Sequence, residues 1–272
     1  MIWCLENSMR YFVALGFALV ACSPAQDAAP TLDPSAYTLV DLTHPFNAQT
    51  IYWPTSTRTF EHPQQAFGPT PGGWFYSSYE LSTPEHGGTH LDAPIHFGEG
   101  KQTADQIPLN RLVAKAVVID VSARASADRD YLLTPEDVTA FESQHGQIAE
   151  GTIVLLRTGW SSRWGNRLEY LGDSTKGDAS KLHFPSFGPD AARLLVEQRR
   201  VAALGVDVAS IDRGKSTDFM VHRLAAAGNV PGFENLTNLD QLPATGAVII
   251  ALPMKIEAGS GGPLRAIAMV PR

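Results

Sequence analysis

Apolar residues along the chain gather in seven short runs that are rich in β-branched side chains. Several runs are apolar at successive positions, as expected for strands that are buried on both faces of a sheet. The runs cover residues 37–42, 75–81, 113–121, 152–158, 201–206, 247–252 and 264–270. Their length and composition predict seven strands.

Helical signals are fewer. Thr134 provides an N-cap and is followed by a proline and two acidic residues, and Pro189 opens a second segment with a similar start. A third segment ends at Gly228. The predicted helices cover residues 134–142, 189–200 and 217–227. Because strands outnumber helices and interleave with them, the sequence predicts a single mixed α/β domain around a twisted, partly antiparallel or barrel-like sheet with a few flanking helices.

The composition is that of an ordinary globular protein, with 44% apolar and 18% charged residues in a chain of 272. The formal net charge is −7 and the isoelectric point is about 5.6. Lys and Arg form no cluster of the kind that binds a phosphate backbone. The charge pattern therefore argues against a nucleic-acid partner and favours a small-molecule substrate.

Residues 1–22 have the pattern of an export signal. Met9-Arg10 precedes an apolar run over residues 11–21, which is too short to span a bilayer. Leu19-Val-Ala-Cys22 resembles a bacterial lipoprotein processing box. The pattern predicts an exported, periplasmic protein that is lipid-anchored at the outer membrane through Cys22, and an ordinary secretory signal is the alternative. Translation starts at Met1 or at Met9.

A tether is predicted after the signal, over residues 23–36, which are rich in Ala, Pro, Asp and Ser. The folded domain is predicted over residues 37–272. The chain has two cysteines, Cys4 and Cys22, and both precede this domain. The domain can therefore contain neither an internal disulfide nor a thiolate catalyst.

Three of the eight histidines fall within the segment His86-Gly-Gly-Thr-His90-Leu-Asp92-Ala-Pro-Ile-His96. Two glycines and a proline make a helix implausible here, so the segment is predicted to be a tight glycine turn that enters a short strand. Residues two apart on a strand share a face, which places His90 and Asp92 together, and the glycines allow His86 to fold back toward them.

Two imidazoles and a carboxylate that converge in this way form a partial coordination shell for Zn²⁺ or Mn²⁺, with an open position for water. Pro94 stiffens the chain before His96, which places a further polar group near the metal as an acid or base. The sequence therefore predicts a metal site made by His86, His90 and Asp92.

The same segment resembles the signature of the cyclase family of metal-dependent hydrolases, which includes bacterial kynurenine formamidases and isatin hydrolases. The resemblance extends from about residue 38 to the C-terminus and implies a swivelling β/α/β fold, one or two divalent ions and a homodimer. Further motifs that carry it are Val40-Asp-Leu-Thr-His-Pro, Tyr52-Trp-Pro, Arg157-Thr-Gly-Trp, Phe184-Pro-Ser-Phe and Gly205-Val-Asp-Val-Ala-Ser-Ile-Asp.

By this resemblance, a second group of residues completes the metal site. Asp92 and Glu234 would bridge to a second ion, whose site His222 completes. From the residues alone, His222 on a predicted helix and Glu234 in a loop carry no such signal. The resemblance also implies that His96 is the catalytic acid or base and that Trp53 lines a pocket for an aromatic substrate.

The implied reaction is attack of a metal-activated water on the carbonyl of a small aryl amide. Arylformamidase activity of the kynurenine formamidase type, a step of tryptophan catabolism, is the first expectation, although export counts against it. Ring opening of a cyclic amide or lactone, as by isatin hydrolase, is the alternative. A second alternative is an exported metal- or ligand-binding lipoprotein without catalysis.

Other polar and aromatic residues are interpreted as structural. Asp207 and Asp212 are assigned to turns that follow a strand. Trp160 and Trp164 are assigned to packing. The remaining histidines are also assigned structural roles, namely His44, His62, His145 and His183.

Overall fold

The chain folds around a barrel-like sheet of eight strands. In this computed structural model, which describes residues 33–272, the strand order is β1-β12-β11-β5-β7-β9-β10-β4, and β4 also pairs with β12. Seven strands therefore close into a ring, and β1 extends it at one edge. The eight strands of the sheet are β1 (Tyr37–Asp41), β4 (His90–Asp92), β5 (Val113–Asp120), β7 (Ile153–Arg157), β9 (Ala203–Val206), β10 (Gly232–Glu234), β11 (Thr245–Pro253) and β12 (Gly261–Pro271). The predicted mixed α/β fold with a barrel-like sheet is confirmed.

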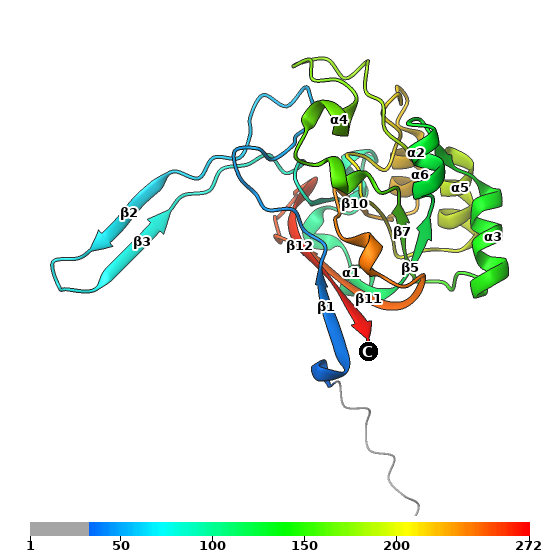
Figure 1. Ribbon diagram of the computed structural model, residues 1–272, viewed down its shortest axis with the longest axis horizontal. Coiled ribbons are helices and arrows are strands. Elements are labelled where there is room, and N and C mark those ends of the chain that lie inside the picture. Colours follow the sequence, from blue (N-terminus) through cyan, green and yellow to red (C-terminus); the bar gives the residue numbers. More distant parts are fainter. Residues whose placement is uncertain (1–32) are drawn as a thin grey trace, which may run out of the picture. The chain divides into compact units, whose positions relative to one another are not determined.

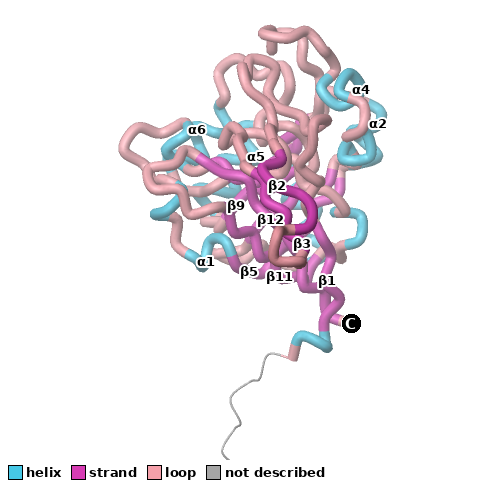
Figure 2. Tube along the Cα trace, turned by 90° about the vertical axis from the view of Figure 1, so that its left-hand side faces the viewer, coloured by secondary structure: helices cyan, strands magenta, loops and turns pink. Residues whose placement is uncertain are grey.

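Strands β5, β7, β9 and β10 run parallel, and the other pairings of the ring are antiparallel. Successive side chains of the parallel strands enter two different cores, which explains their continuous apolar sequence. Val154 on β7 packs in the core under the helices, whereas its neighbour Leu155 packs inside the ring. Figure 1 shows helices α2 (Ser122–Ala127), α3 (Pro135–His145), α5 (Pro189–Arg193) and α6 (Met220–Ala227) together on one side of the strands, and Figure 2 shows the strands of the sheet from a second direction.

The helices are short, and two of the three predicted ones begin where expected. Thr134 caps α3 by accepting a hydrogen bond from the Asp137 amide, and α5 begins at Pro189. The third prediction, a helix over residues 217–227, is wrong at its start, because Phe219 has a left-handed backbone (φ 49°) that α6 cannot include. The helices are α1 (Leu109–Leu112), α2 (Ser122–Ala127), α3 (Pro135–His145), α4 (Arg167–Leu171), α5 (Pro189–Arg193), which a π-helical turn extends over Leu194–Gln198, and α6 (Met220–Ala227).

One predicted strand lies outside the eight-stranded sheet. Residues Phe75–Tyr79 form β3, which pairs with β2 (Gln64–Pro69) in a separate two-stranded hairpin. Figure 1 shows this hairpin projecting from the ring. A second small sheet pairs β6 (Leu132–Leu133) with β8 (Ser186–Phe187). The short strand predicted after the glycine turn is present as β4, whereas the sequence analysis missed β10, because a strand of three residues has too little periodicity to be recognised.

Residues Ser35–Arg272 form one compact unit. The predicted signal, the lipoprotein box with Cys22 and all but the last residues of the predicted tether lie outside the described residues. Residues Pro34–Ala36, at the end of that tether, form a single 3-10 turn. None of the helices within residues 33–272 is long and apolar enough to cross a membrane.

Two tryptophans that were assigned to packing do pack. Trp160 is 1% exposed in the core under the helices. Trp164 stacks on His44, with ring centroids 4.2 Å apart and planes within 6°. Nε2 of His44 is buried without a hydrogen-bond partner among the described residues. Burial lowers the pKa of His44 to about 4, so the imidazole is neutral at pH 7.

Replacing His44 with Phe should weaken the acid sensitivity of folding. The folded-state pKa of about 4 lies below the unfolded value, so His44 stabilises the fold above pH 6.5 and this contribution is lost as the pH falls. Between pH 7 and pH 5 the loss amounts to about 2 kcal/mol. Urea unfolding at both pH values should show this loss in the wild type and not in His44→Phe. His145→Phe, on the exposed part of α3, is the control; equal pH dependence in all three proteins would contradict the assignment.

Candidate metal centre

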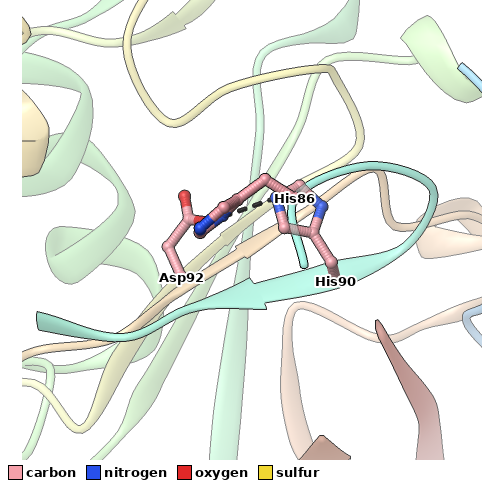
Figure 3. Close-up of side chains that lie close together, drawn as sticks. All are labelled: His86, His90 and Asp92. Atoms are coloured by element: carbon pink, nitrogen blue, oxygen red, sulfur yellow. Dashed lines mark hydrogen bonds and ion pairs between the residues drawn. The ribbon is translucent and has the colours of Figure 1, made fainter. Parts of the chain in front are cut away.

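The glycine turn before β4 folds His86 back over the strand (Figure 3). Gly87 and Gly88 both have positive φ, 144° and 60°. A Cβ on Gly87 would lie 2.1 Å from the Tyr52 ring, so only glycine fits this turn. The turn brings Nδ1 of His86 to 2.5 Å from Oδ1 of Asp92. This arrangement agrees with the turn and short strand that the sequence predicts.

Alternation along β4 separates its side chains. Leu91 is fully buried inside the ring, whereas His90 and Asp92 point to the opposite face. Nε2 of His90 lies 3.2 Å from Oδ1 of Asp92. The structure therefore brings His86, His90 and Asp92 together, with donor atoms that lie within 4.8 Å of one another.

Two residues from distant parts of the sequence complete the cluster. Strand β10 pairs with β4 so that Glu234 lies opposite His90, and His222 lies on α6. Nε2 of His222 is 3.0 Å from Oδ2 of Asp92 and 3.2 Å from Oε1 of Glu234. Asp92, His222 and Glu234 thus form a second group of three potential ligands, which shares Asp92 with the first.

Burial and charge act against each other on the two carboxylates. Burial raises the pKa of Asp92, but the adjacent His90 and His86 outweigh it and hold the pKa well below the usual value. The pKa of Glu234 is raised, first by burial and then by the negative charge of Asp92. Two carboxylates that are each about 5% exposed need positive charge beside them. A divalent cation bound between them would supply that charge.

Each histidine of the cluster uses its outer nitrogen for a hydrogen bond. His90 donates from Nδ1 to the Gly88 carbonyl oxygen, 2.9 Å away. His222 donates from Nδ1 to Oδ2 of Asp212 at 2.7 Å. These bonds fix the tautomers so that Nε2 of both rings faces the carboxylates. The donor set of imidazole nitrogens and carboxylate oxygens fits Zn²⁺ or Mn²⁺.

Asp212 was assigned to turn chemistry, and its position beside His222 was missed. It also accepts hydrogen bonds from the amides of Val221 and His222 at the start of α6, each at 3.0 Å. The carboxylate therefore fixes both the start of the helix and the ring that the helix presents. A cap that lies eight residues before its helix cannot be recognised from local sequence.

His86 is held from outside by a serine and a glutamate that the sequence analysis also missed. Its Nε2 donates to Oγ of Ser260 at 2.8 Å, and the Ser260 hydroxyl donates to Oε2 of Glu85 at 2.5 Å. Glu85 also accepts from the Ser260 amide. Because the outer nitrogen is occupied, Nδ1 of His86 faces Asp92. Such contacts orient metal-binding histidines and increase their basicity.

Replacing Ser260 with Ala should weaken metal binding without removing a ligand. Loss of the contact to Nε2 frees the His86 ring, and outer contacts of this kind typically change metal affinity by about 10–100-fold. Competition with a chromophoric chelator measures the change. Ser260→Thr keeps the hydroxyl and should restore affinity, and Ser143→Ala on α3, an exposed position, is the control. Unchanged affinity in Ser260→Ala would show that the contact does not position His86.

A cavity of about 250 Å³ opens over the cluster. The histidines, Asp92 and Glu234 lie in one part of its wall, and Trp53, Phe97 and Phe219 lie in another. The rings of Trp53 and Phe219 are 6.4 Å apart, edge to face. The structure thus places Trp53 in the wall of a partly aromatic pocket, and it adds Phe97 and Phe219, which the sequence analysis did not single out.

His96 lies at the edge of the cluster and is absent from both groups of potential ligands. It ends the 3-10 turn Pro94–His96 and stacks on His86, with centroids 3.8 Å apart. Its ring also lines the cavity. Burial lowers the pKa of His96 to about 4, against an opposing effect of Asp92, so the ring is neutral and able to accept a proton at pH 7.

Several candidate residues remain outside the site. Asp207 accepts three hydrogen bonds from Thr158 and Gly159, and burial raises its pKa to about 6. It ties the end of β9 to the loop after β7, which agrees with a structural role. His62, His145 and His183 do not line the cavity.

Comparison with known proteins identifies the family. The sequence profile of the Cyclase family matches residues 40–213. The chain belongs to the Cyclase family. It is 38% identical to isatin hydrolase from Roseibium aggregatum over 208 residues, which are 74% of this chain and 77% of that protein. It is 32% identical to kynurenine formamidase from Salinibacter ruber over 190 residues, 70% of this chain and 77% of that protein.

A solved structure of a Cyclase-family member has the same fold. The crystal structure of an isatin hydrolase bound to the product analogue thioisatinate superposes with a TM-score of 0.79 at 33% identity, covering 88% of this chain and 94% of that chain. The family resemblance inferred from residues 86–96 is thus confirmed. The chain is a Cyclase-family hydrolase.

Proposed function

We propose that this hydrolase is metal-dependent and opens the ring of a small cyclic aryl amide of the isatin type. The observation that carries the proposal is the cavity, which combines an aromatic wall with two overlapping groups of metal ligands. At about 250 Å³ it suits a compact substrate, since pockets for drug-sized ligands start at about 300 Å³. The similarity to isatin hydrolases supports ring opening as the reaction.

The chain supplies five ligands for one or two ions, namely His86, His90, Asp92, His222 and Glu234. A cation bound there acts as a Lewis acid that lowers the pKa of a water molecule and polarises a carbonyl. The outer contacts of the histidines hold the donor atoms in place before substrate arrives, which limits reorganisation during the reaction.

His96 accepts the proton of the attacking water and returns it to the amide nitrogen when the C–N bond breaks. Its neutral ring and its position in the cavity wall suit both steps. Trp53 and Phe219 hold the aromatic ring of the substrate and thereby orient the carbonyl toward the ligands. Water adds across one C–N bond, and the products are an amine and a carboxylate on the same molecule.

Arylformamidase activity is the second candidate. The similarity to kynurenine formamidase supports it, because the same ligands and the same base can cleave a formamide that an aromatic ring carries. The substrate then loses formate instead of opening a ring. The two reactions differ in the shape of the substrate and require the same catalytic groups.

A direct comparison of two substrates tests the proposal. The purified chain is incubated with isatin and with N-formylkynurenine, before and after removal of divalent ions and after restoration with Zn²⁺ or Mn²⁺. We expect metal-dependent loss of isatin absorbance at a higher kcat/KM than formamide cleavage. Preference for the formamide would support the second candidate. Stoichiometric metal without turnover of either compound would favour the non-catalytic binding protein, and turnover that is independent of metal would contradict the metal site.

We also propose that the enzyme is exported and lipid-anchored through Cys22. The apolar run over residues 11–21 and the box Leu19-Val-Ala-Cys22 support this proposal. Labelling of cells with a fatty acid should mark the wild-type chain and leave Cys22→Ser unlabelled. Equal labelling of both proteins, or of neither, would contradict lipidation.

A further inference from the structure

Three polar side chains in the cavity wall have no part in the reaction proposed above, namely those of Tyr52, Ser210 and Asn235. The Tyr52 hydroxyl is hydrogen-bonded to Oγ1 of Thr83 at 2.6 Å. The side chain of Asn235 donates to the Gly88 carbonyl oxygen at 2.8 Å and accepts from a buried tyrosine hydroxyl at 2.9 Å. Both of these groups are paired within the protein, which leaves Ser210 as the one of the three that can serve a bound molecule.

The Ser210 hydroxyl holds an unused hydrogen-bond donor. Ser210 is 3% exposed, and its Oγ accepts a hydrogen bond from the Asp212 amide at 3.2 Å. Within residues 33–272, no atom accepts the proton of this hydroxyl. Buried hydroxyl groups normally have a partner for that proton. Because the side chain lines the cavity, a molecule bound there can provide the acceptor.

The position of this hydroxyl is fixed by the peptide group that follows it. The Ser210 carbonyl oxygen accepts a hydrogen bond from Oγ of Ser186 at 2.7 Å. The N–H of Ile211, in the same peptide group, donates to Oε1 of Glu234 at 2.8 Å. The segment then continues to Asp212, which orients a further metal ligand. The hydroxyl is therefore held in place beside the second ligand group before substrate arrives.

A substrate of the isatin type carries the acceptor that this position requires. Its ring contains two adjacent carbonyl groups, and water attacks only the carbonyl of the amide. The cavity wall away from the ligands is largely aromatic and apolar, so the oxygen of the second carbonyl needs a specific donor there. A formamide carries a hydrogen atom at the corresponding position and offers no second oxygen.

We propose that Ser210 donates a hydrogen bond to the second carbonyl oxygen of a substrate with two adjacent carbonyl groups. This inference rests on the proposed ring-opening function and adds the side chain that selects the substrate. A neutral hydrogen bond of this kind changes affinity by about tenfold. A ligand without the second oxygen leaves the buried hydroxyl unpaired, which also acts against binding. Ser210 thereby favours dicarbonyl substrates over formamides and simple lactams.

The test measures the binding of two probes to the metal-loaded full chain by isothermal titration calorimetry. Phenylglyoxylate has an oxo group between its ring and its carboxylate, as the ring-opened product of isatin does, and phenylacetate has a methylene group in that place. Ser210→Ala should weaken binding of phenylglyoxylate by about tenfold and leave binding of phenylacetate unchanged. Elemental mass spectrometry on the same samples should give the metal content of the wild type.

Ser186→Ala is the matched control. It removes the hydroxyl that holds the Ser210 carbonyl oxygen, and Ser186 is as deeply buried as Ser210 but does not line the cavity. A change in the position of the segment should affect both probes alike, whereas loss of the donor affects phenylglyoxylate alone. The ratio of the two affinities should therefore stay at the wild-type value in Ser186→Ala and fall in Ser210→Ala.

The outcomes separate this inference from the proposed function. Equal weakening of both probes in Ser210→Ala, or loss of metal, would overturn the inference and show that Ser210 supports the ligands through Asp212. A wild type that opens isatin, together with a Ser210→Ala variant that keeps the wild-type ratio of affinities, would overturn the role of Ser210 and leave ring opening in place. A wild type that does not bind phenylglyoxylate would overturn the role of Ser210 whichever substrate is hydrolysed.

Discussion

Replacing Asp92 with Asn should abolish metal binding and lower turnover by at least about 10³-fold. Removal of a single hydrogen-bond donor from an active site lowers turnover by up to about 10³-fold, and loss of the bound ion should have an effect at least as large. Asp92 belongs to both groups of potential ligands, with one oxygen near His86 and His90 and the other near His222. Asn removes the negative charge and turns a donating N–H toward one set of histidines. Elemental mass spectrometry and a substrate assay on the same sample measure both effects.

The control for this substitution is Asp190→Asn, which removes an acid at an exposed position of α5 and should leave metal content and turnover unchanged. Circular dichroism shows whether the folded state is retained. An Asp92→Asn protein that keeps stoichiometric metal would mean that the shared carboxylate is dispensable. The proposed two-group site would then be wrong.

Replacing His96 with Gln should separate metal binding from turnover. His96 is in neither ligand group, so the variant should bind metal with unchanged stoichiometry. Loss of the base should lower kcat by about 10²–10⁴-fold, with a smaller change in KM. The measurement combines metal content with steady-state kinetics on the substrate that the wild type prefers.

His145→Gln provides the matched control, because His145 lies on α3 outside the cavity. Loss of metal in His96→Gln would identify His96 as a ligand instead of a base. Full turnover would leave the proton transfer to another group. Either result would require a different assignment of His96, while the assignment of the ligands themselves would be judged by Asp92→Asn.

The sequence predicted the parts of the fold and of the site that depend on local pattern. Continuous apolar runs identify β5, β7 and β9 because both faces of these strands are buried. The glycine turn and the alternation along β4 likewise bring His86, His90 and Asp92 together with no information beyond eleven residues of sequence. In both cases the decisive interaction lies within a few positions along the chain.

Residues that meet through tertiary structure could not be found in this way. Glu234 joins His90 through the pairing of β10 with β4, and family resemblance was needed to single it out. Ser260 reaches His86 across 174 positions, and Asp212 reaches His222 through the loop before α6. A serine or an aspartate in a loop has the same local sequence whether it orients a ligand or faces solvent.

The closure of the ring through β4 has a consequence for how the protein matures. Strand β4 is bounded on one side by β10 and on the other by residues Gly261–Pro263 of β12, and Ser260 just before β12 holds His86. The ligands on β4 are therefore complete only after the last strand has joined the sheet. We expect a chain in transit, before its C-terminal strand has folded, to have little affinity for metal. Binding of the ion and completion of the native fold then become a single event. The ions available in the compartment where the chain folds therefore determine which ion it binds.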